Sequence, residues 1–482
     1  MRDLLIYFYF FLLFYLAFYG LHIYWLVGLY LKYRSENHQP PIIANDFPCV
    51  TIQLPIYNER AVVSRLIETA AALDWPMNKL EIQVLDDSND DTGSIAAAVV
   101  NKLRTQGCNV HHVRRSQRTG FKAGALENGL KTAFGEFIAV FDADNLPRPD
   151  FLKKMMGYFS DTKIGMVQAR WSFLNREESL LCRAQALFLD AHFYVEQAAR
   201  SRGGLFMNFN GTAGIWRRKA IESAGGWQTD TLTEDLDLSY RAQMAGWRMI
   251  FAEEVDVPTE LPSSIRAFKT QQFRWAKGAI ESGVKLLPKL LKMPIPKRLK
   301  IAAFFHLTQK TVSVALLLLS VMLIPALYLR LEGGMWKVLA LDLPIFLAGT
   351  GSMSLFYGLA YKKEMSNHSW QNNLLLPLLT SLGISLAVNN SLAILFAVTG
   401  KRSQFVRTPK TGSIDKGHSL PPPGYRISFD YTIQIELLLT LYAVYALWCA
   451  VSLELYQTLP FLMTFTFGYV YFSFKSIKEW YA

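Results

Sequence analysis

Long apolar runs flank a central stretch in which short apolar segments alternate with polar ones. The first run, residues 4–31, contains no Lys, Arg, Asp or Glu and exceeds the roughly 20 apolar residues that cross a bilayer. It is longer than the apolar core of a signal peptide and lacks a small-residue cleavage site. We therefore predict a transmembrane helix within residues 1–33. Further apolar segments follow at about 306–329, 338–361, 372–399, 432–452 and 456–475.

Basic residues beside these runs indicate which of them cross the membrane. If all five later segments crossed, the basic loop 400–416 and the basic C-terminus (Lys475, Lys478) would lie outside, against the positive-inside rule. The segment 372–399 is also unusually polar, with an Asn pair at 389–390 and several serines. We therefore predict five spans, one before the central stretch and four after it, with 372–399 as an interfacial helix. The central stretch then lies on the cytosolic side of a multi-pass membrane protein.

The central stretch, residues 45–280, has the pattern of an α/β fold. Strands are expected at 50–54, 81–85, 110–113 and 137–141, separated by helices at 61–73, 92–103 and 122–133. This alternation predicts a mostly parallel sheet with helices on both faces, and ligands in such sheets bind at the carboxyl ends of the strands. Residues 281–304 are basic and Leu-rich, which predicts amphipathic helices on the membrane surface. Residues 305–482 form the C-terminal transmembrane region.

Charge and cysteine usage narrow the class of partner. The net charge of +11 would suit nucleic acid, but the basic residues gather beside apolar segments. That distribution is typical of contact with anionic lipid, so we expect a lipid bilayer and no nucleic acid as partner. The four cysteines are scattered without a CxxC spacing, which predicts neither a disulfide framework nor a zinc site.

A pair of carboxylates follows the fourth expected strand. Asp142 and Asp144, one residue apart, can reach a hard divalent cation, Mg²⁺ or Mn²⁺, that neutralises a diphosphate. The alternative interpretation is a turn in which Asp caps the backbone, helped by Asn145. Because another carboxylate stands at a neighbouring strand end, we favour the metal site.

Two other expected strand ends carry groups suited to a nucleotide. Tyr57 and Glu59 follow the first strand and Asp87 follows the second. An aromatic ring and two acceptors suit a nucleobase with ring N–H groups, although Asp at such places also caps helices. Lys122 stands at a helix start, where a phosphate binds favourably; its alternative is a solvated lysine.

The last two motifs can supply a base and a platform. Asp235, in Thr233-Glu234-Asp235, can take the proton of an attacking hydroxyl, although an acidic helix start capped by Thr233 explains the same residues. In Gln271-x-x-Arg274-Trp275, Arg can stabilise phosphate oxygens and Trp can stack on a sugar. The alternative there is an interfacial anchor.

These motifs resemble those of one enzyme family. QLPIYNE, DDS, KAGAL, DAD, TED and QQFRW occur in the order seen in membrane-integrated family 2 glycosyltransferases of the cellulose synthase type. The stretches DAHFYVEQ, FNGTAGIWR and GGW resemble more narrowly the cellulose synthase-like A and C enzymes, which make β-mannan, glucomannan and glucan backbones.

The resemblance implies a GT-A fold and inverting transfer of a hexose from UDP-glucose or GDP-mannose to a growing β-linked polysaccharide. Because the predicted spans directly abut the expected acceptor platform, we further predict that transfer is processive and that the polysaccharide crosses the membrane. The resemblance also implies that Asp87 contacts the base, that Asp142 contacts the nucleotide phosphates and that Asp144 holds the metal. Asp235 would be the catalytic base. The platform for acceptor and diphosphate would consist of Gln271, Arg274 and Trp275, and the acceptor end would lie near Asn210, Gly211 and Thr212.

The resemblance leaves several points open. A loop that closes over the nucleotide, with a pattern close to FxVTxKG, is matched incompletely by 396–402 and by 405–412; we favour the second because it lies within the loop 400–416. A ceramide- or lipid-glycosylating enzyme without polymer translocation is the alternative function. A transporter or receptor is disfavoured because the spans hold almost no charges. The partners are a nucleotide-sugar donor and a glycan acceptor, with a homo-oligomer or an accessory subunit left open.

Overall fold

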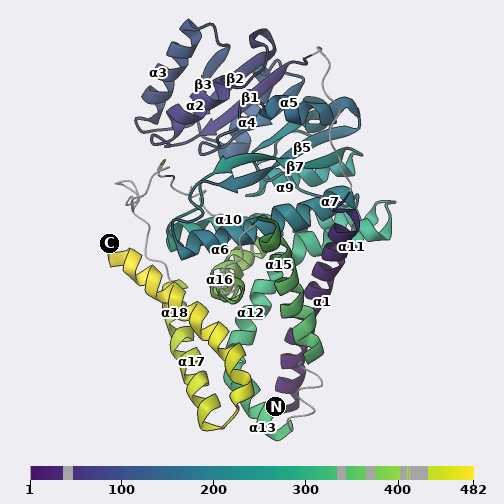
Figure 1. Ribbon diagram of the computed structural model, residues 1–482, viewed down its shortest axis with the longest axis vertical. Helices are drawn as coiled ribbons and strands as arrows, with labels where there is room; N and C mark the ends of the chain where they lie inside the picture. The colour runs from purple at the N-terminus through teal and green to yellow at the C-terminus, as the bar shows by residue number, and fades with distance from the viewer. Residues whose placement is uncertain are drawn as a thin grey trace.

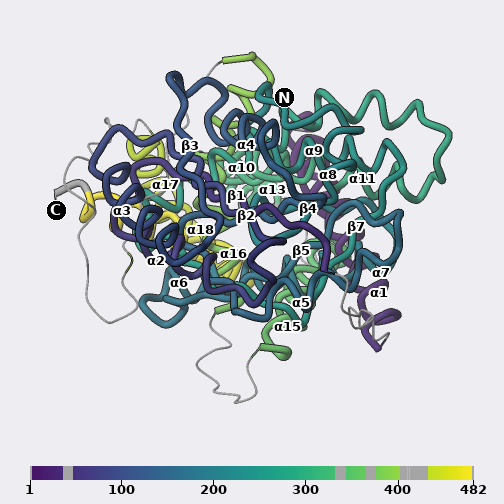
Figure 2. The backbone as a smooth tube through the Cα atoms, turned by 90° about the horizontal axis from the view of Figure 1, so that it is seen from above, coloured from purple at the N-terminus to yellow at the C-terminus, as the bar shows by residue number. Residues whose placement is uncertain are grey.

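The computed structural model describes residues 2–35, 47–333, 343–364, 375–401, 410, 412 and 432–481. A domain of strands and helices forms one end of the molecule and long helices form the other (Figure 1). Seen from above, α17 and α18 lie beneath one side of the domain and α1 lies beneath the opposite side (Figure 2).

One sheet of seven strands organises the described part of the domain, in the order β3-β2-β1-β4-β6-β5-β7. Its strands are β1 Val50–Ile56, β2 Leu80–Asp86, β3 Val110–Arg114, β4 Phe137–Val140, β5 Ile164–Phe173, β6 Gly214–Arg217 and β7 Arg248–Thr259. Within this sheet β6 runs antiparallel to β4 and β5, and every other neighbouring pair is parallel. The predicted mostly parallel sheet is confirmed, and the four expected strands all form.

Helices cover both faces of the sheet, which explains the nearly continuous burial of β1 and β2. Alternate residues of β4 enter opposite hydrophobic clusters: Ile138 and Val140 in one, Phe137 and Ala139 in the other, as the two-residue period of a strand requires. The helices of the domain are α2 Val63–Ala71, α3 Thr92–Thr105, α4 Phe121–Thr132, α5 Phe151–Met156, α6 Leu180–Ala191, α7 Ala198–Arg202, α8 Arg218–Ser223 and α9 Glu234–Met244.

A long helix separates the sheet domain from the apolar helices. α10, Ile265–Lys292, lies beneath the sheet (Figure 1) and is followed by α11, Lys297–Thr308. Ser264 caps α10 by accepting from the Ala267 N–H, and the Glu479 carboxylate accepts from the Ile265 N–H at 2.8 Å. α10 passes through the expected boundary at residue 280 without a break. The platform motif and the first part of the basic segment therefore share one rigid helix.

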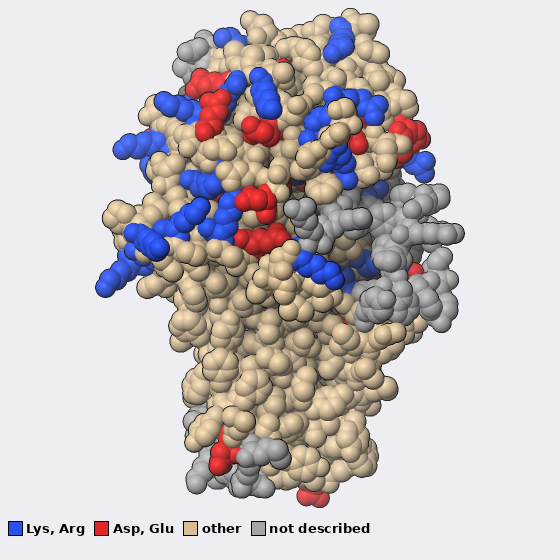
Figure 3. Space-filling model, turned by 180° about the vertical axis from the view of Figure 1, so that it is seen from behind, with Lys and Arg blue, Asp and Glu red and all other residues tan. Residues whose placement is uncertain are grey.

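The apolar part of the chain consists of helices that differ in direction. α1 and α17 run down the length of the molecule in Figure 1, whereas α16 is seen nearly end-on beneath α10. Figure 3 shows Lys and Arg gathered on the sheet domain and along its lower border, with few charges on the helices below. The bounds are α1 Arg2–Tyr33, α12 Val312–Val321, α13 Leu323–Gly333, α15 Ser352–Glu364, α16 Leu375–Val398, α17 Thr432–Ser452 and α18 Leu459–Tyr481.

Within the described residues, five helices are long and apolar enough to cross a membrane. They are Asp3–Tyr33, Lys297–Val321, Leu343–Glu364, Leu375–Val398 and Thr432–Ser452. This set includes α16, for which we expected an interfacial position, and omits α18, for which we expected a span. Length and composition do not consider direction, however, and α16 is the helix that lies across the others in Figure 1.

A buried ion pair joins α10 to α17 and leads to a prediction about stability. Lys269 Nζ lies 2.8 Å from Glu436 Oε1, with the two side chains 4% and 0% exposed. Removing one partner of such a pair leaves a buried charge uncompensated and costs about 3–5 kcal/mol. Lys269→Met should therefore lower the thermal unfolding temperature in detergent, and Lys269→Met/Glu436→Leu should recover most of the loss. A single variant that unfolds at the wild-type temperature would contradict this expectation.

Candidate active site

The carboxyl ends of the parallel strands and one face of α10 line a cleft that is open to solvent. Every residue that we assigned to a site from the sequence lines this cleft. They are Tyr57, Glu59, Asp87, Lys122, Asp142, Asp144, Asn210, Gly211, Thr212, Asp235, Gln271, Arg274 and Trp275. The structure thus brings together residues from the whole central stretch.

The region expected to hold the nucleobase contains two arginines that we did not predict. The Arg118 guanidinium lies 3.4 Å from the centre of the Tyr57 ring and 5.0 Å from that of Phe121. Arg115 Nε donates to Asp87 Oδ1 at 2.9 Å. Both arginines follow the end of β3, so the strand-end rule that found Asp87 could have found them.

Lys122 joins the first Asp of the metal motif to the loop after α7. Its ammonium donates to Asp142 Oδ1 at 2.6 Å and to the Gly211 carbonyl at 2.9 Å. Burial lowers the pKa of Lys122, but Asp142 and Glu234 outweigh it and hold the pKa above its usual value. Lys122 therefore carries a positive charge, as contact with a phosphate requires.

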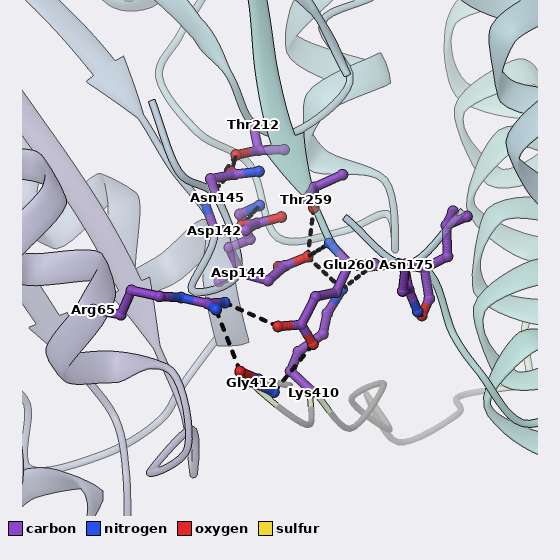
Figure 4. Close-up of polar contacts among 12 residues, drawn as sticks. Arg65, Asp142, Asp144, Asn145, Asn175, Thr212, Thr259, Glu260, Lys410 and Gly412 are labelled. Atoms are coloured by element: carbon purple, nitrogen blue, oxygen red, sulfur yellow. Dashed lines mark hydrogen bonds and ion pairs between the residues drawn. The ribbon is translucent and has the colours of Figure 1, made fainter. Parts of the chain in front are cut away.

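Asp144 is held by three donors (Figure 4). Its Oδ2 accepts from the Thr259 hydroxyl at 2.5 Å, from the Glu260 N–H at 3.0 Å and from Lys410 Nζ at 2.7 Å. Burial raises the pKa of Asp144, but Lys410 and these hydrogen bonds hold it below its usual value. The second Asp is thus ionised and paired with an ammonium.

Lys410 belongs to the stretch 405–412, our preferred candidate for the closing loop. Its other acceptor is the Glu260 carbonyl, at 2.9 Å, while the Glu260 carboxylate pairs with Arg65 at 2.9 Å and accepts from the Gly412 N–H at 3.3 Å (Figure 4). We did not predict Glu260, although it directly follows β7 and the strand-end rule would have found it. The rest of 405–412 lies outside the described residues, and the rival stretch continues the end of α16 as far as Lys401.

The oxygen ligands of the site suit a small hard cation that arrives with phosphate. Among the described residues, no group of three or more His, Cys, Asp or Glu is placed to hold a metal. Mg²⁺ is commonly bound by one or two carboxylates and completes its shell with substrate phosphates and water. Asp142 and Asp144 fit that pattern.

Asp235 lies in the first turn of α9, beside the loop of Gly211. A Cβ added at Gly211, whose φ is +82°, would lie 2.9 Å from Asp235 Oδ2, so only glycine allows this approach. Burial and the neighbouring Glu234 raise the pKa of Asp235 to about 7, close to the ideal for a general base at neutral pH. The alternative reading of Thr233 was wrong in one detail, since its side chain makes no capping hydrogen bond.

The part of α10 that follows the platform motif lies against the residues that precede α9. A Cβ added at Gly278 would lie 2.5 Å from the Thr233 Cγ2 atom, and the Glu281 carboxylate accepts from the Leu232 N–H at 2.9 Å. These contacts fix α10, which carries Arg274 and Trp275, against the segment that leads to Asp235, and all three residues line the cleft.

The loop expected near the acceptor is tied to the metal motif. The Asp142 N–H donates to Thr212 Oγ1 at 2.8 Å, and the Asn210 N–H donates to Gln168 Oε1 at 2.9 Å. The candidate metal motif and the candidate acceptor loop are therefore joined by a direct hydrogen bond.

Comparison with known proteins identifies the class. The family model described as "Glycosyltransferase like family 2" matches residues 48–278. A glucomannan 4-beta-mannosyltransferase from Cyamopsis tetragonoloba is 33% identical over 431 residues, which are 87% of this chain and 80% of that protein. The chain therefore belongs to the family 2 glycosyltransferases, and the predicted resemblance is confirmed.

Other relatives carry the same description. Glucomannan 4-beta-mannosyltransferase 2 of Arabidopsis thaliana is 41% identical over 266 residues, 54% of this chain and 50% of the relative. Glucomannan 4-beta-mannosyltransferase 1 of Oryza sativa is 38% identical over 293 residues, 58% of this chain and 56% of the relative. The matched part thus spans about half the length of these two relatives.

A solved structure confirms the fold. A mannosyltransferase from Pyrobaculum calidifontis, in complex with GDP-Man and Mn²⁺, superimposes with a TM-score of 0.51 at 19% identity, covering 80% of this chain and 100% of that one. The sheet domain therefore has the expected GT-A fold. Because the chain belongs to the family 2 glycosyltransferases, it is an enzyme rather than a transporter or receptor.

Proposed function

We propose that this protein transfers a hexose, with inversion, from a nucleotide sugar to a growing β-linked polysaccharide. One observation carries the proposal: Asp235, whose pKa is raised to about 7, shares a cleft with the Asp142–Asp144 pair and the α10 platform. The names of the relatives, and the GDP-Man held by the structural neighbour, favour GDP-mannose over UDP-glucose as donor.

In the proposed mechanism, different residues of the cleft bind different parts of the nucleotide. The nucleobase is held by Tyr57, Glu59 and Asp87, and the phosphates are contacted by Lys122 and Asp142. Asp144, with Asp142, would hold Mg²⁺ or Mn²⁺, which neutralises the diphosphate when bound; the Mn²⁺ of the structural neighbour supports a divalent ion.

The acceptor half of the cleft completes the reaction. Asp235 takes the proton of the acceptor hydroxyl as that oxygen attacks the anomeric carbon. Arg274 stabilises the departing diphosphate, together with Gln271, and Trp275 stacks on the acceptor sugar. Asn210, Gly211 and Thr212 complete the acceptor site.

We further propose a multi-pass protein with a cytosolic catalytic domain, in which the glycan passes between the helices. Contacts between the catalytic domain and the ends of apolar helices support five crossings, because they show which end of each helix lies at the domain. The end of α18 reaches the start of α10 through Glu479, the start of α17 reaches Lys269 through Thr432, and the end of α15 reaches Arg176 through Glu364. Asn389 of α16 donates to the Lys269 carbonyl at 3.0 Å, which supports an interfacial helix beneath α10.

A donor panel tests the function. The protein purified in detergent would be incubated with Mg²⁺ or Mn²⁺ and radiolabelled nucleotide sugars, and products would be digested with linkage-specific glycanases. We expect a β-linked polymer from GDP-mannose. Products that carry a single sugar on a lipid would contradict the proposal and indicate the lipid-glycosylating alternative, and short glycans alone would contradict processivity.

The pKa of Asp235 predicts the pH dependence of transfer. A base acts only when deprotonated, so kcat/KM should rise with pH and level off above a pKa near 7. The rise should be absent from the residual activity of Asp235→Asn, which has no carboxyl group to titrate. A wild-type profile flat between pH 5 and 8 would argue against Asp235 as the base.

The Lys410–Asp144 contact predicts a change in metal affinity. The Lys410 ammonium is paired with the Asp144 carboxylate, which we assign to the metal, so an incoming metal ion must displace the ammonium. Lys410→Met should therefore bind Mn²⁺ more tightly without donor, by about tenfold if the pair is worth about 1.4 kcal/mol. Electron paramagnetic resonance of free Mn²⁺ measures this directly, with Lys401→Met as control because its carbonyl, not its ammonium, contacts Lys277. Equal affinities in both variants and wild type would contradict the prediction.

A further inference from the structure

One turn of the helix beneath the cleft is wider than an α-helical turn. α6 continues into a π-helical turn, His192–Gln197, and then into α7. In an α-helix, side chains five residues apart point about 140° away from each other. The i→i+5 pairing of a π-turn brings them closer in direction, and such turns are frequent at functional sites. Here the wider turn places His192 and Gln197 on the same side.

Both side chains bind the amide of Asn210, from opposite ends. Gln197 Nε2 donates to Asn210 Oδ1 at 2.7 Å, and Asn210 Nδ2 lies 2.8 Å from His192 Nε2. With the amide reversed, its NH₂ group would face the NH₂ group of Gln197. The two contacts therefore select one direction for this amide.

A buried ion pair selects the tautomer of His192. His192 Nδ1 lies 3.0 Å from Glu196 Oε2, and Arg200 Nε donates to Glu196 Oε1 at 2.9 Å. Burial raises the pKa of Glu196, but Arg200 and His192 hold it well below its usual value, so Glu196 is a carboxylate. The two contacts of the ring fit the tautomer that carries its proton on Nδ1, facing the carboxylate, and that accepts from Asn210 at Nε2.

We propose that His192 and Gln197 are positioning residues that orient the Asn210 amide toward the acceptor sugar. Asn210 lines the cleft, and its neighbour Gly211 lies against Asp235. His192 and Gln197 do not line the cleft, so they act through Asn210. One N–H and one lone pair of the amide remain to bind hydroxyl groups of the acceptor sugar. By binding them, the amide would determine which acceptor hydroxyl reaches Asp235. The inference rests on the proposed function.

The test separates use of the acceptor from use of the donor. Purified wild type, His192→Leu and Gln197→Met would be given GDP-mannose and Mn²⁺ with and without the β-1,4-linked probe mannotetraose. Both variants should raise the KM for mannotetraose about tenfold, because each loses one orienting hydrogen bond. The KM for GDP-mannose, and the slow release of GDP to water without acceptor, should stay at wild-type values.

Two further variants distinguish positioning from folding. His192→Gln keeps an acceptor oxygen near the place of Nε2 and should recover most of the wild-type KM. Tyr194→Phe alters the same π-turn, but the Tyr194 hydroxyl donates to Glu364 Oε2 at 2.6 Å rather than to Asn210, so its KM for mannotetraose should equal that of wild type.

Other outcomes would overturn the inference. Parallel losses of transfer and of GDP release would show a merely structural role, as would an unchanged KM for mannotetraose in either folded variant. If His192→Leu does not fold, Gln197→Met decides. A wild-type protein that neither transfers nor hydrolyses any nucleotide sugar would overturn the proposed function itself, and this inference with it.

Discussion

Asp235→Asn is expected to abolish most transfer while the protein still binds its nucleotide. Asn has the same size as Asp, so it fits beside Gly211, but it cannot take a proton from the acceptor hydroxyl. General-base assistance contributes about 10²–10⁴ to a rate, and kcat should fall by that factor. The affinity for GDP should be unchanged, because the groups that we assign to the nucleotide lie outside α9. Steady-state kinetics and calorimetric titration with GDP measure the two quantities.

Asp237→Asn is the matched control for this prediction. Asp237 lies in the same turn of α9 and is fully buried, but it pairs with Arg241 at 2.7 Å and Lys285 at 2.8 Å and does not line the cleft. Its replacement should lower the unfolding temperature and leave kcat near the wild-type value. If Asp235→Asn kept more than a tenth of wild-type transfer, Asp235 would not be the base.

Asp144→Asn is expected to cause the second large loss. A bound divalent cation stabilises developing phosphate charge by several kcal/mol, and each 1.36 kcal/mol is tenfold in rate, so transfer should fall by at least about 10²-fold at fixed Mn²⁺. High Mn²⁺ should restore part of the rate, because Asp142 remains. Removing metal with EDTA should abolish wild-type transfer, and adding Mn²⁺ should restore it.

The control for Asp144 is a carboxylate of the sheet that does not line the cleft. Asp256, on β7, accepts from the Ser172 hydroxyl at 2.7 Å, and Asp256→Asn should keep the wild-type Mn²⁺ dependence. If Asp144→Asn kept the wild-type Mn²⁺ dependence, the metal would be bound by other residues than Asp144. Lys410 would then pair with Asp144 for a purely structural reason.

Much of the site was predictable because strand-end residues need no knowledge of distant contacts. Asp87 and Asp142 each follow an apolar strand, and parallel strands place their carboxyl ends at one edge. The same rule covers Glu260 and Arg118, which the prediction omitted because neither belongs to a motif of the resemblance. The contact between Lys410 and Asp144 has no such local basis, since 266 residues separate the two.

The apolar helices show the limit of composition. Hydropathy and length select α16 and omit α18, because the apolar residues of α16 outweigh its Asn and Ser residues in an average over the helix. The argument from loop charge makes the opposite choice: it selects α18 as a span and leaves α16 at the membrane surface. The direction of α16 beneath α10 and the contact of Glu479 with Ile265 depend on packing between segments far apart in the chain, and no window along the chain contains them.

The sequence by itself determined the family, the alternation of strands and helices and the order of the chemical groups, because these follow from local periodicity and from residues at strand ends. Only the tertiary structure decided how the groups meet. It placed an ammonium on Asp144, a guanidinium on Tyr57 and a π-turn beneath Asn210. Each of these requires a choice of helical register or side-chain partner, and packing against distant segments makes that choice.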